Sequence, residues 1–214
     1  MNIAEPLIFV SPIKKKCEIK KGFHEYSHNC GMLLLEKAFS YISYPFSEND
    51  IIRAENGKPY LKGDPVCFSI SHCDGLAVCA LSDVPTGVDC ESKRHISTAV
   101  MKRCYGDSES RYVLNSDDSD TAFSRLWTLK ESYVKMTGGG IASDLKTKCF
   151  DIENSRALFE SRAVFYHYGC AFNNNDYFIS VCIKTDDKKS AETIQVTDFD
   201  IDNEHILLYN VSDN

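Results

Sequence analysis

The chain carries two short acidic segments, Gly87-Val88-Asp89-Cys90-Glu91 and Trp127-Thr128-Leu129-Lys130-Glu131. The first ends an apolar run that follows a turn, a pattern that predicts a strand over 86–91. Because side chains alternate between the faces of a strand, Asp89 and Glu91 point to one side and Cys90 to the other. The second segment follows a helical pattern, so Glu131 projects from a helix. Carboxylates from a strand and a helix can converge on Mg²⁺, a cation that prefers oxygen ligands and often holds substrate phosphates as well.

The helix that carries the second segment is predicted over 117–137, with acidic residues at its start and a glycine at its C-terminal cap. On a helical wheel its apolar arc includes Trp127, and Lys130 falls inside that arc. Trp127, Glu131 and Lys135 follow one another at four-residue spacing along one edge of the arc. An ordinary surface salt bridge is one interpretation of this edge. A lysine within an apolar arc and a carboxylate at its border favour a partly buried polar site instead.

Four motifs follow one another in the sequence: Gly57-Lys58-Pro59, Ser69-Ile70-Ser71-His72, Gly87-Val88-Asp89-x-Glu91 and Trp127-x-x-Lys130-Glu131-x-x-x-Lys135-x-x-Gly138-x-Gly140. No single motif is specific, but the ordered set resembles the 4′-phosphopantetheinyl transferases, namely the larger, surfactin-synthetase-activating type. The similarity runs from about residue 57 to residue 140 and is looser on both sides. It implies Mg²⁺-dependent transfer of the 4′-phosphopantetheine group of coenzyme A to a serine of an apo carrier protein, acyl or peptidyl. The other product would be adenosine 3′,5′-bisphosphate.

The resemblance also implies roles for individual residues. Asp89, Glu91 and Glu131 would be the ligands of Mg²⁺, which neutralises the pyrophosphate and stabilises the charge on the leaving group. Lys135 would approach the phosphate or the attacking hydroxyl. Glu131 is the candidate general base for the serine proton, either directly or through a metal-bound water. Glu109 stands where the family has an acidic residue that helps to orient the catalytic lysine.

The 3′-phosphate end of coenzyme A is expected to meet a second group of residues. A histidine just after a strand, such as His72 beside Ser71, can donate to a phosphate, and Lys58 adds a positive charge. The family usually places an arginine in the helix before the Gly-Lys-Pro turn. Residues 24–31 contain no arginine, so His28 is the candidate to replace it, which leaves the affinity for coenzyme A open.

The order of the predicted elements indicates an α+β fold. The first elements are a helix over 27–46, strands over 66–71 and 76–81 with a loop at 72–75 between them, and a strand over 86–91. A helix over 97–114, broken near residue 106, and the helix over 117–137 follow. The last elements are strands over 148–152, 162–168 and 177–184, with a turn at 173–176 between the last two, and a tail from 188 in which polar and apolar residues alternate. The resemblance adds the pseudo-dimeric architecture of the family, two similar α+β halves with coenzyme A in the cleft between them. The halves are expected at 1–84 and 85–214, and the second carries the metal site.

The composition argues against several other classes of protein. The chain has 214 residues, of which 43% are hydrophobic and 26% charged, as in an ordinary soluble protein. Its net charge of −7 provides no basic excess for binding nucleic acid. The lysines at 14–16 and 20–21 are interpreted as a solvated run, with a local phosphate contact as the alternative.

The sequence also bears on the compartment in which the protein acts. No stretch is as long and apolar as a membrane span, and residues 1–11 lack the pattern of a signal peptide. The ten cysteines include no Cys-x-x-Cys pair. We therefore expect reduced, mostly buried thiols in a cytoplasmic protein. The chain is expected to act as a monomer, without a membrane or nucleic-acid partner.

Two other functions compete with the transferase. A metal-dependent nuclease is suggested because Asp89…Glu91-Ser92-Lys93 imitates an Asp…Glu-x-Lys core. The separation is too short for residues on two adjacent strands, and the negative net charge opposes this function. The other is a non-catalytic module that binds coenzyme A or a carrier protein. The presence of three carboxylates together with Lys135 argues against such a module.

Overall fold

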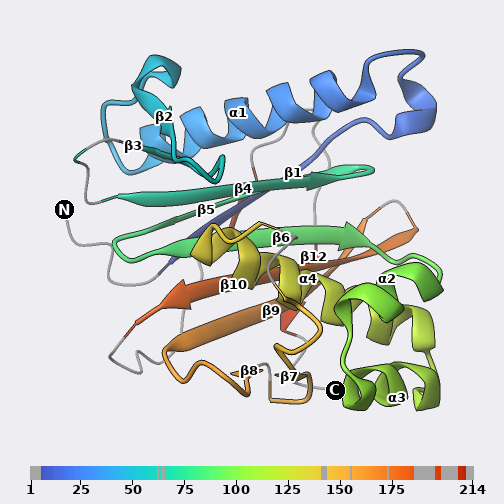
Figure 1. Ribbon diagram of the computed structural model, residues 1–214. Coiled ribbons are helices and arrows are strands. Elements are labelled where there is room, and N and C mark those ends of the chain that lie inside the picture. Colours follow the sequence, from blue (N-terminus) through green and yellow to red (C-terminus); the bar gives the residue numbers. More distant parts are fainter. Residues whose placement is uncertain are drawn as a thin grey trace.

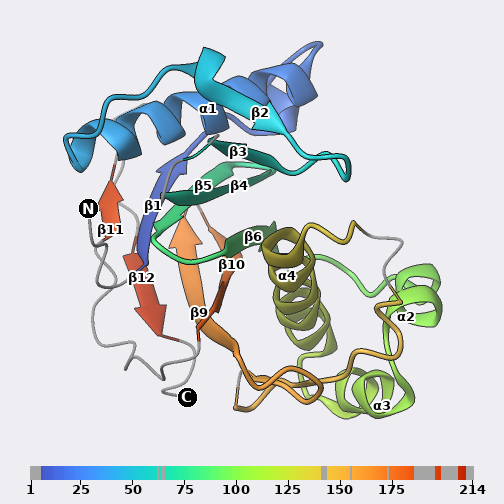
Figure 2. The same ribbon diagram turned by 60° about the vertical axis from the view of Figure 1, so that its left-hand side comes forward.

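The computed structural model describes residues 6–61, 63, 66–140, 144–154, 156–172, 174–185, 196–198 and 207–210. These residues form two main sheets, and each sheet has a long helix packed against it (Figures 1 and 2). This mixture of helices and largely antiparallel sheets confirms the predicted α+β class. None of the helices that these residues form is long and apolar enough to cross a membrane.

The first sheet combines strands from the two ends of the described chain. Its order is β11 (Val196–Asp198), β1 (Leu7–Pro12), β5 (Leu76–Ser82) and β4 (Cys67–Cys73). The predicted pair of strands is confirmed as β4 and β5, which turn at Asp74 and Gly75. The prediction of a loop over 72–75 is wrong at its start. His72 lies within β4 because it pairs with Ala77 in the antiparallel ladder.

Helix α1 (Phe23–Tyr41) covers the outer face of this sheet. Its fully buried side chains are Leu34, Leu35, Ala38 and Phe39. The sequence pattern predicts 27–46 for this helix. It begins earlier because Gly22, in the left-handed conformation (φ 76°), redirects the chain without the side-chain cap that marks a start in sequence. It ends earlier because Phe46 folds back onto Phe39, where the two rings stack with centroids 4.5 Å apart.

A small hairpin of β2 (Ile51–Arg53) and β3 (Pro59–Leu61) extends from the α1 side of the first sheet (Figure 1). It turns at Gly57, whose φ of 85° is a conformation that side chains with a Cβ rarely adopt. The turn follows from the Gly-Lys-Pro motif. The strands do not, because three residues are too few to show alternation.

The second sheet has the order β6 (Thr86–Ser92), β10 (Asn175–Lys184), β9 (Ala163–Phe172), β8 (Arg156–Ala157) and β7 (Phe150–Asp151), and β12 (Leu207–Asn210) also pairs with β9. Its helices are α2 (Thr98–Cys104), α3 (Asp107–Asn115) and α4 (Ser119–Thr137). The strand over 86–91 and the broken helix over 97–114 are thereby confirmed. The helix over 117–137 is confirmed as α4. Its N-cap is Asp118, which accepts from Thr121 N, and its C-cap is Gly138, with φ of 74°.

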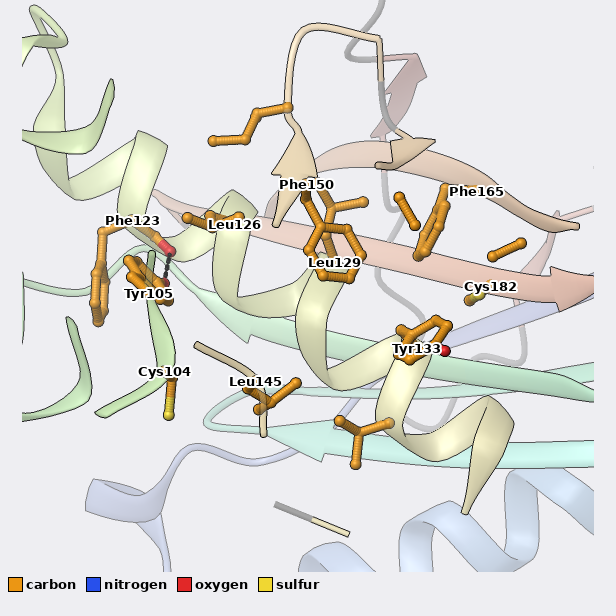
Figure 3. Close-up of a cluster of buried hydrophobic side chains, with 14 of the residues drawn as sticks. Cys104, Tyr105, Phe123, Leu126, Leu129, Tyr133, Leu145, Phe150, Phe165 and Cys182 are labelled. Carbon is orange, nitrogen blue, oxygen red and sulfur yellow. Dashed lines mark hydrogen bonds between the residues drawn. The ribbon is translucent and has the colours of Figure 1, made fainter. Parts of the chain in front are cut away.

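The core of the second half fills the space between α4 and its sheet (Figure 3). Tyr105 is buried in it, and its hydroxyl donates to the carbonyl of Phe123 at 2.9 Å. The strand predicted over 148–152 is shorter in the structure, where only β7 (Phe150–Asp151) forms. The carbonyls of Leu145 and Lys148 accept from the ammonium of Lys130, at 2.9 and 2.8 Å, so the backbone here bonds to a side chain instead of a neighbouring strand.

Two predictions near the end of the chain are tested only in part. The turn over 173–176 is shorter than expected because β10 already begins at Asn175, and Asn173 lies outside the described residues. Of the tail from 188, only β11 and β12 are described. β11 pairs with β1 in the first sheet, so the division into 1–84 and 85–214 stays a prediction.

The two sheets meet where β4 runs beside β6, a junction that we call the seam. Two serines of β4 bridge it: Ser69 Oγ accepts from Val88 N at 3.0 Å, and Ser71 Oγ accepts from Cys90 N at 3.4 Å. Behind the seam the inner faces of both sheets share a third apolar core. Helix α4 lies so close to β6 that a Cβ on Gly87 would meet backbone atoms of α4 at 2.2 Å. The seam therefore brings β4, β6 and α4 into contact.

Candidate active site

Three polar side chains from three different elements meet at the seam. Ser71 of β4 donates to Asp89 Oδ1 of β6 at 2.8 Å. Lys135 of α4 donates to the same carboxylate oxygen at 2.7 Å and to Ser71 Oγ at 2.7 Å. All three come from motifs that the sequence singles out, and they close a triangle at the junction of the two halves.

Strand β6 presents its residues as the alternation predicts. Cys90 is buried in the core between the sheets, 1% exposed. Asp89 and Glu91 face α4, because Asp89 pairs with Lys135 and Glu91 Oε1 accepts from Trp127 Nε1 at 3.1 Å.

Burial and the charge of Asp89 raise the pKa of the two glutamates of this site. Burial, and then the charge of Asp89, raises the pKa of Glu131 to about 7. The same two causes, in the same order, raise the pKa of Glu91 to about 7. Burial lowers the pKa of Lys135, but the charge of Asp89 and the hydrogen bond to it outweigh burial, so the net shift is upward. The site therefore holds more negative charge than Lys135 alone neutralises.

Two buried oxygens at this site accept no hydrogen bond from the described part of the chain, Asp89 Oδ2 and Glu131 Oε1. An unpartnered buried carboxylate oxygen is costly, and a cation is the partner that compensates it best. Within the described ranges, no three His, Cys, Asp or Glu side chains are arranged so that they could hold a metal ion as they stand. The donor set of Asp89, Glu91 and Glu131 thus fits a hard divalent cation in chemistry and charge.

A cleft of about 510 Å³ opens beside this group and is lined by residues of α1, β2, β3, β4 and α4. Its polar lining includes five of the candidate site residues from the sequence, His28, Lys58, His72, Glu131 and Lys135. Its size lies in the range of small-molecule sites. The structure therefore brings the expected phosphate-binding residues and the carboxylate Glu131 to one cavity.

His72 points away from the seam triangle because its neighbour Ser71 faces the other side of β4. Its ring meets that of His24 on α1 edge-on, with centroids 6.2 Å apart. Burial, and then the charges of Lys135, His24 and His28, lowers the pKa of His72. A neutral imidazole can still donate one hydrogen bond to an anion.

Lys58 is placed differently from the expectation of a free positive charge. Its ammonium donates to two backbone carbonyls, that of Thr86 at 3.1 Å and that of Met136 at 2.7 Å. Burial lowers the pKa of Lys58. The side chain ties the Gly-Lys-Pro turn to β6 and to the C-terminal end of α4, where a positive charge is favourable.

Glu109 lies apart from this site. Its carboxylate pairs with Lys130 at 2.9 Å and accepts from the backbone of Gly106 at 2.7 Å and of Phe150 at 2.9 Å. Both members of the pair are buried, with side chains 0% and 1% exposed. The structure does not bring Glu109 to Lys135. Glu109 instead pairs with Lys130, the lysine inside the apolar arc of α4.

Two arginines near the cleft and the carboxylates do not emerge from the sequence. Arg53 of β2 lines the cleft and donates to the carbonyl of Gly57 at 3.3 Å. Arg94 follows β6, and its guanidinium lies 3.5 Å from Glu91 Oε1. The only sequence signals for them are a basic residue four before Gly57 and another three after Glu91, and neither signal is specific.

Comparison with known proteins gives a consistent match. Residues 85–197, just over half of the chain, match the model of the 4′-phosphopantetheinyl transferase superfamily. The 4′-phosphopantetheinyl transferase gsp of Aneurinibacillus migulanus is 33% identical over 119 residues, which cover 54% of this chain and 50% of that protein. The 4′-phosphopantetheinyl transferase Sfp of Bacillus subtilis is 32% identical over 146 residues, 64% of each chain.

Two further similarities are more distant. The L-aminoadipate-semialdehyde dehydrogenase-phosphopantetheinyl transferase of Saccharomyces cerevisiae is 29% identical over 157 residues, 66% of this chain and 58% of that protein. A solved structure, the holo-[acyl-carrier-protein] synthase of Thermotoga maritima, overlaps 48% of this chain and 64% of that chain, with a TM-score of 0.37 and 19% identity. The chain thus spans about half to two thirds of the length of these curated relatives.

Proposed function

Because this chain belongs to the 4′-phosphopantetheinyl transferase superfamily, we propose that it is a transferase that modifies carrier proteins. It moves 4′-phosphopantetheine from coenzyme A to a serine of an apo acyl or peptidyl carrier protein and releases adenosine 3′,5′-bisphosphate. One observation carries the proposal. Glu131 and Lys135 line a cleft between α1, β4 and α4, and Lys135 contacts Asp89, which has a buried oxygen without a partner among the described residues.

Asp89, Glu91 and Glu131 would hold Mg²⁺. The unpartnered oxygens of Asp89 and Glu131, and the raised pKa values of Glu91 and Glu131, support this assignment. The cation would neutralise the pyrophosphate and stabilise the charge that develops on the leaving group.

Lys135 serves the pyrophosphate end of coenzyme A. Lys135 lines the cleft and its ammonium is held by Asp89, so a phosphate that enters the cleft meets a positive charge that is already in place. Electrostatic stabilisation of this kind acts without reorganisation because the donor is held before the reaction begins. Ser71 supports Lys135 and Asp89 from β4 instead of contacting the coenzyme.

Glu131 accepts the proton of the attacking serine. The serine oxygen forms a bond to the β-phosphorus of coenzyme A, and the bond from that phosphorus to the bridging oxygen breaks. The electron pair leaves with adenosine 3′,5′-bisphosphate. Glu131 borders the cleft, so its carboxylate can receive a proton that is released there.

His72 and His28 contact the 3′-phosphate of coenzyme A from the β4 and α1 sides of the cleft. Lys58 acts on the same end by holding the Gly-Lys-Pro turn in place, since its ammonium already bonds two carbonyls. Both halves of one chain line the cleft, which supports activity as a monomer. The ten free cysteines support a cytoplasmic location, and the net charge of −7 supports a partner other than nucleic acid.

Intact-mass spectrometry tests the proposal. Purified protein with Mg²⁺ and coenzyme A should add one phosphopantetheine per apo carrier protein, and an excess of EDTA should prevent the addition. The matched control is a carrier in which alanine replaces the acceptor serine, which should gain no mass. The absence of an adduct on several unrelated carriers would contradict the proposal and favour a non-catalytic module.

A further inference from the structure

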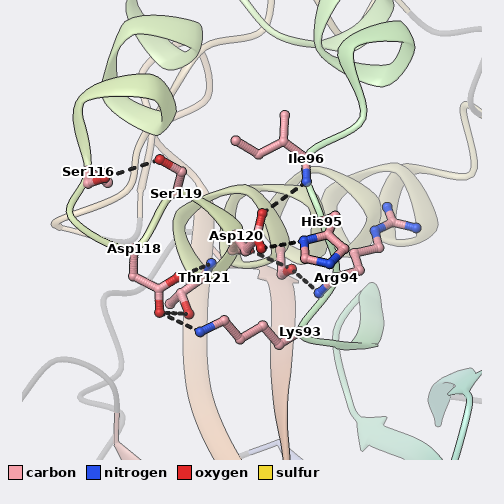
Figure 4. A network of polar contacts seen from close by, with 10 residues as sticks. Lys93, Arg94, His95, Ile96, Ser116, Asp118, Ser119, Asp120 and Thr121 are labelled. Atoms are coloured by element: carbon pink, nitrogen blue, oxygen red, sulfur yellow. Dashed lines mark hydrogen bonds and ion pairs between the residues drawn. The ribbon is translucent and has the colours of Figure 1, made fainter.

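Arg94 lies in a short segment that is fastened to the first turns of α4. Its own backbone N–H donates to Ser124 Oγ at 3.2 Å. On either side, Lys93 pairs with Asp118, and His95 contacts Asp120 at 2.7 Å (Figure 4). These contacts fix the position of Arg94 relative to the helix that carries Glu131.

The side chain of Arg94 has aromatic neighbours and one carboxylate. The guanidinium carbon lies 5.4 Å from the ring centroid of Phe123 and 5.2 Å from that of Trp127, two residues one turn apart on α4. Its NH1 lies 3.5 Å from Glu91 Oε1. Nε and NH2 are buried and make no hydrogen bond to any described residue. Glu91 is therefore the polar contact that orients this cation.

Trp127 donates to the same oxygen. Its indole N–H lies 3.1 Å from Glu91 Oε1. No hydrogen bond from a described residue reaches the other oxygen, Oε2. The hydrogen bond from Trp127 and the ion pair with Arg94 thus both involve Oε1 of Glu91, and the second oxygen remains available for a ligand.

We propose that Trp127 and Arg94 are positioning residues that hold Oε1 of Glu91 so that Oε2 faces the cation shared with Asp89 and Glu131. This inference rests on the magnesium site of the proposed function. Neither side chain touches the substrate or the cation. Hydrogen-bonding partners of this kind orient a metal ligand, and their loss commonly weakens metal affinity about 10–100-fold. The part of Trp127 that matters for positioning is its N–H, since a phenyl ring can take over its packing.

Manganese binding provides a test that does not depend on catalysis. Mn²⁺ is titrated into the full-length protein without coenzyme A, and the free ion is followed by electron paramagnetic resonance. We expect Trp127→Phe to weaken binding about 10–100-fold. Arg94→Lys keeps the charge but loses the planar group, and should weaken binding less. Arg156→Lys, a matched change at an exposed position on β8, should bind as tightly as the wild type.

Thermal unfolding separates positioning from a general loss of structure. In EDTA, Trp127→Phe should melt close to the wild type, and the gain in melting temperature on adding Mg²⁺ should be smaller. Trp127 is the only tryptophan of the chain, so its emission should also change when the wild type binds Mg²⁺. An emission that stays constant at saturating Mg²⁺ would count against the contact with Glu91 in the bound state.

The outcomes distinguish this inference from the proposed function. If the wild type binds no Mn²⁺, the magnesium site itself is wrong. If the wild type binds and Trp127→Phe binds equally well, the positioning role is overturned and the magnesium site stands. If Trp127→Phe does not fold, Arg94→Lys decides, because wild-type affinity in that variant would overturn the role.

Discussion

Helix α4 carries two lysine–carboxylate pairs whose surroundings differ, although the lysines lie little more than one turn apart. Lys130 is fully buried and has three oxygen partners, Glu109 and the carbonyls of Leu145 and Lys148. Lys135 pairs with Asp89 beside an open cleft, and the second oxygen of Asp89 has no partner in the described chain. A buried network in which every member is satisfied stabilises a fold. One that leaves oxygens unpartnered at a cavity is ready for a ligand.

The largest effect should come from breaking the satisfied pair. Lys130→Met would leave Glu109 buried without its counter-charge, which costs about 3–5 kcal/mol of stability. Chemical denaturation measures this loss, and turnover per folded molecule should stay near the wild-type value. The double variant Glu109→Gln, Lys130→Met should recover part of the stability. A stable Lys130→Met protein without turnover would move this lysine into the active site.

Breaking the pair of Lys135 and Asp89 should reduce turnover and leave stability nearly unchanged. Asp89→Asn should lower turnover by at least about a hundredfold, roughly 2.7 kcal/mol, because a ligand for the cation is lost. Stability should change little, because the side chain of Lys135 is 30% exposed and its charge can be solvated without Asp89. Steady-state kinetics and denaturation curves check the two halves of this prediction. Cys90→Ser, on the opposite face of β6, should bind Mg²⁺ like the wild type.

The cleft beside the unsatisfied pair should discriminate between coenzymes. If His72 donates to the 3′-phosphate, His72→Ala should lose about ten- to a hundredfold of the preference for coenzyme A over 3′-dephospho-coenzyme A. Lys135→Met should reduce kcat/KM for both coenzymes alike. The ratio of kcat/KM values for the two coenzymes measures this preference. An unchanged ratio in His72→Ala would place the 3′-phosphate elsewhere.

The smallest effect should be a dependence of stability on pH. The pKa of Glu131 is raised to about 7 in the folded protein, so folding favours its protonated form, and this contribution is lost as pH rises through about 7. In EDTA, Glu131→Gln should therefore be more stable relative to the wild type at about pH 8 than at about pH 5. Thermal melts of both proteins measure the difference. An equal difference at both pH values would show that burial and the nearby carboxylates do not raise the pKa of Glu131.

Much of this site follows from local sequence signals. The alternation of Asp89, Cys90 and Glu91 predicts which side chains face α4, because the side chains of a strand alternate wherever it lies. The ends of α4 follow from Asp118 and Gly138, because caps depend on neighbouring residues. These features need no knowledge of the rest of the fold.

The partners of the charged residues do not follow from the sequence. The helical wheel separates Lys130, inside the apolar arc, from Lys135 at its edge. It does not indicate that Glu109 pairs with the first and Asp89 with the second. The carbonyls that accept hydrogen bonds from Lys58 belong to β6 and α4, which lie far from Lys58 in the sequence. The same holds for Arg94, whose place between two aromatic rings depends on how the segment after β6 docks on α4. Such contacts depend on tertiary packing.

Diffraction from crystals soaked with Mn²⁺ tests the central claim most directly, namely that the unsatisfied carboxylates at the seam form the cation site. A cation site at the seam should give one anomalous peak within about 2.0–2.3 Å of oxygens from Asp89, Glu91 and Glu131. No peak is expected beside Glu109, whose oxygens are already taken. A peak bound to other residues, or no peak at the seam under saturating Mn²⁺, would contradict this claim.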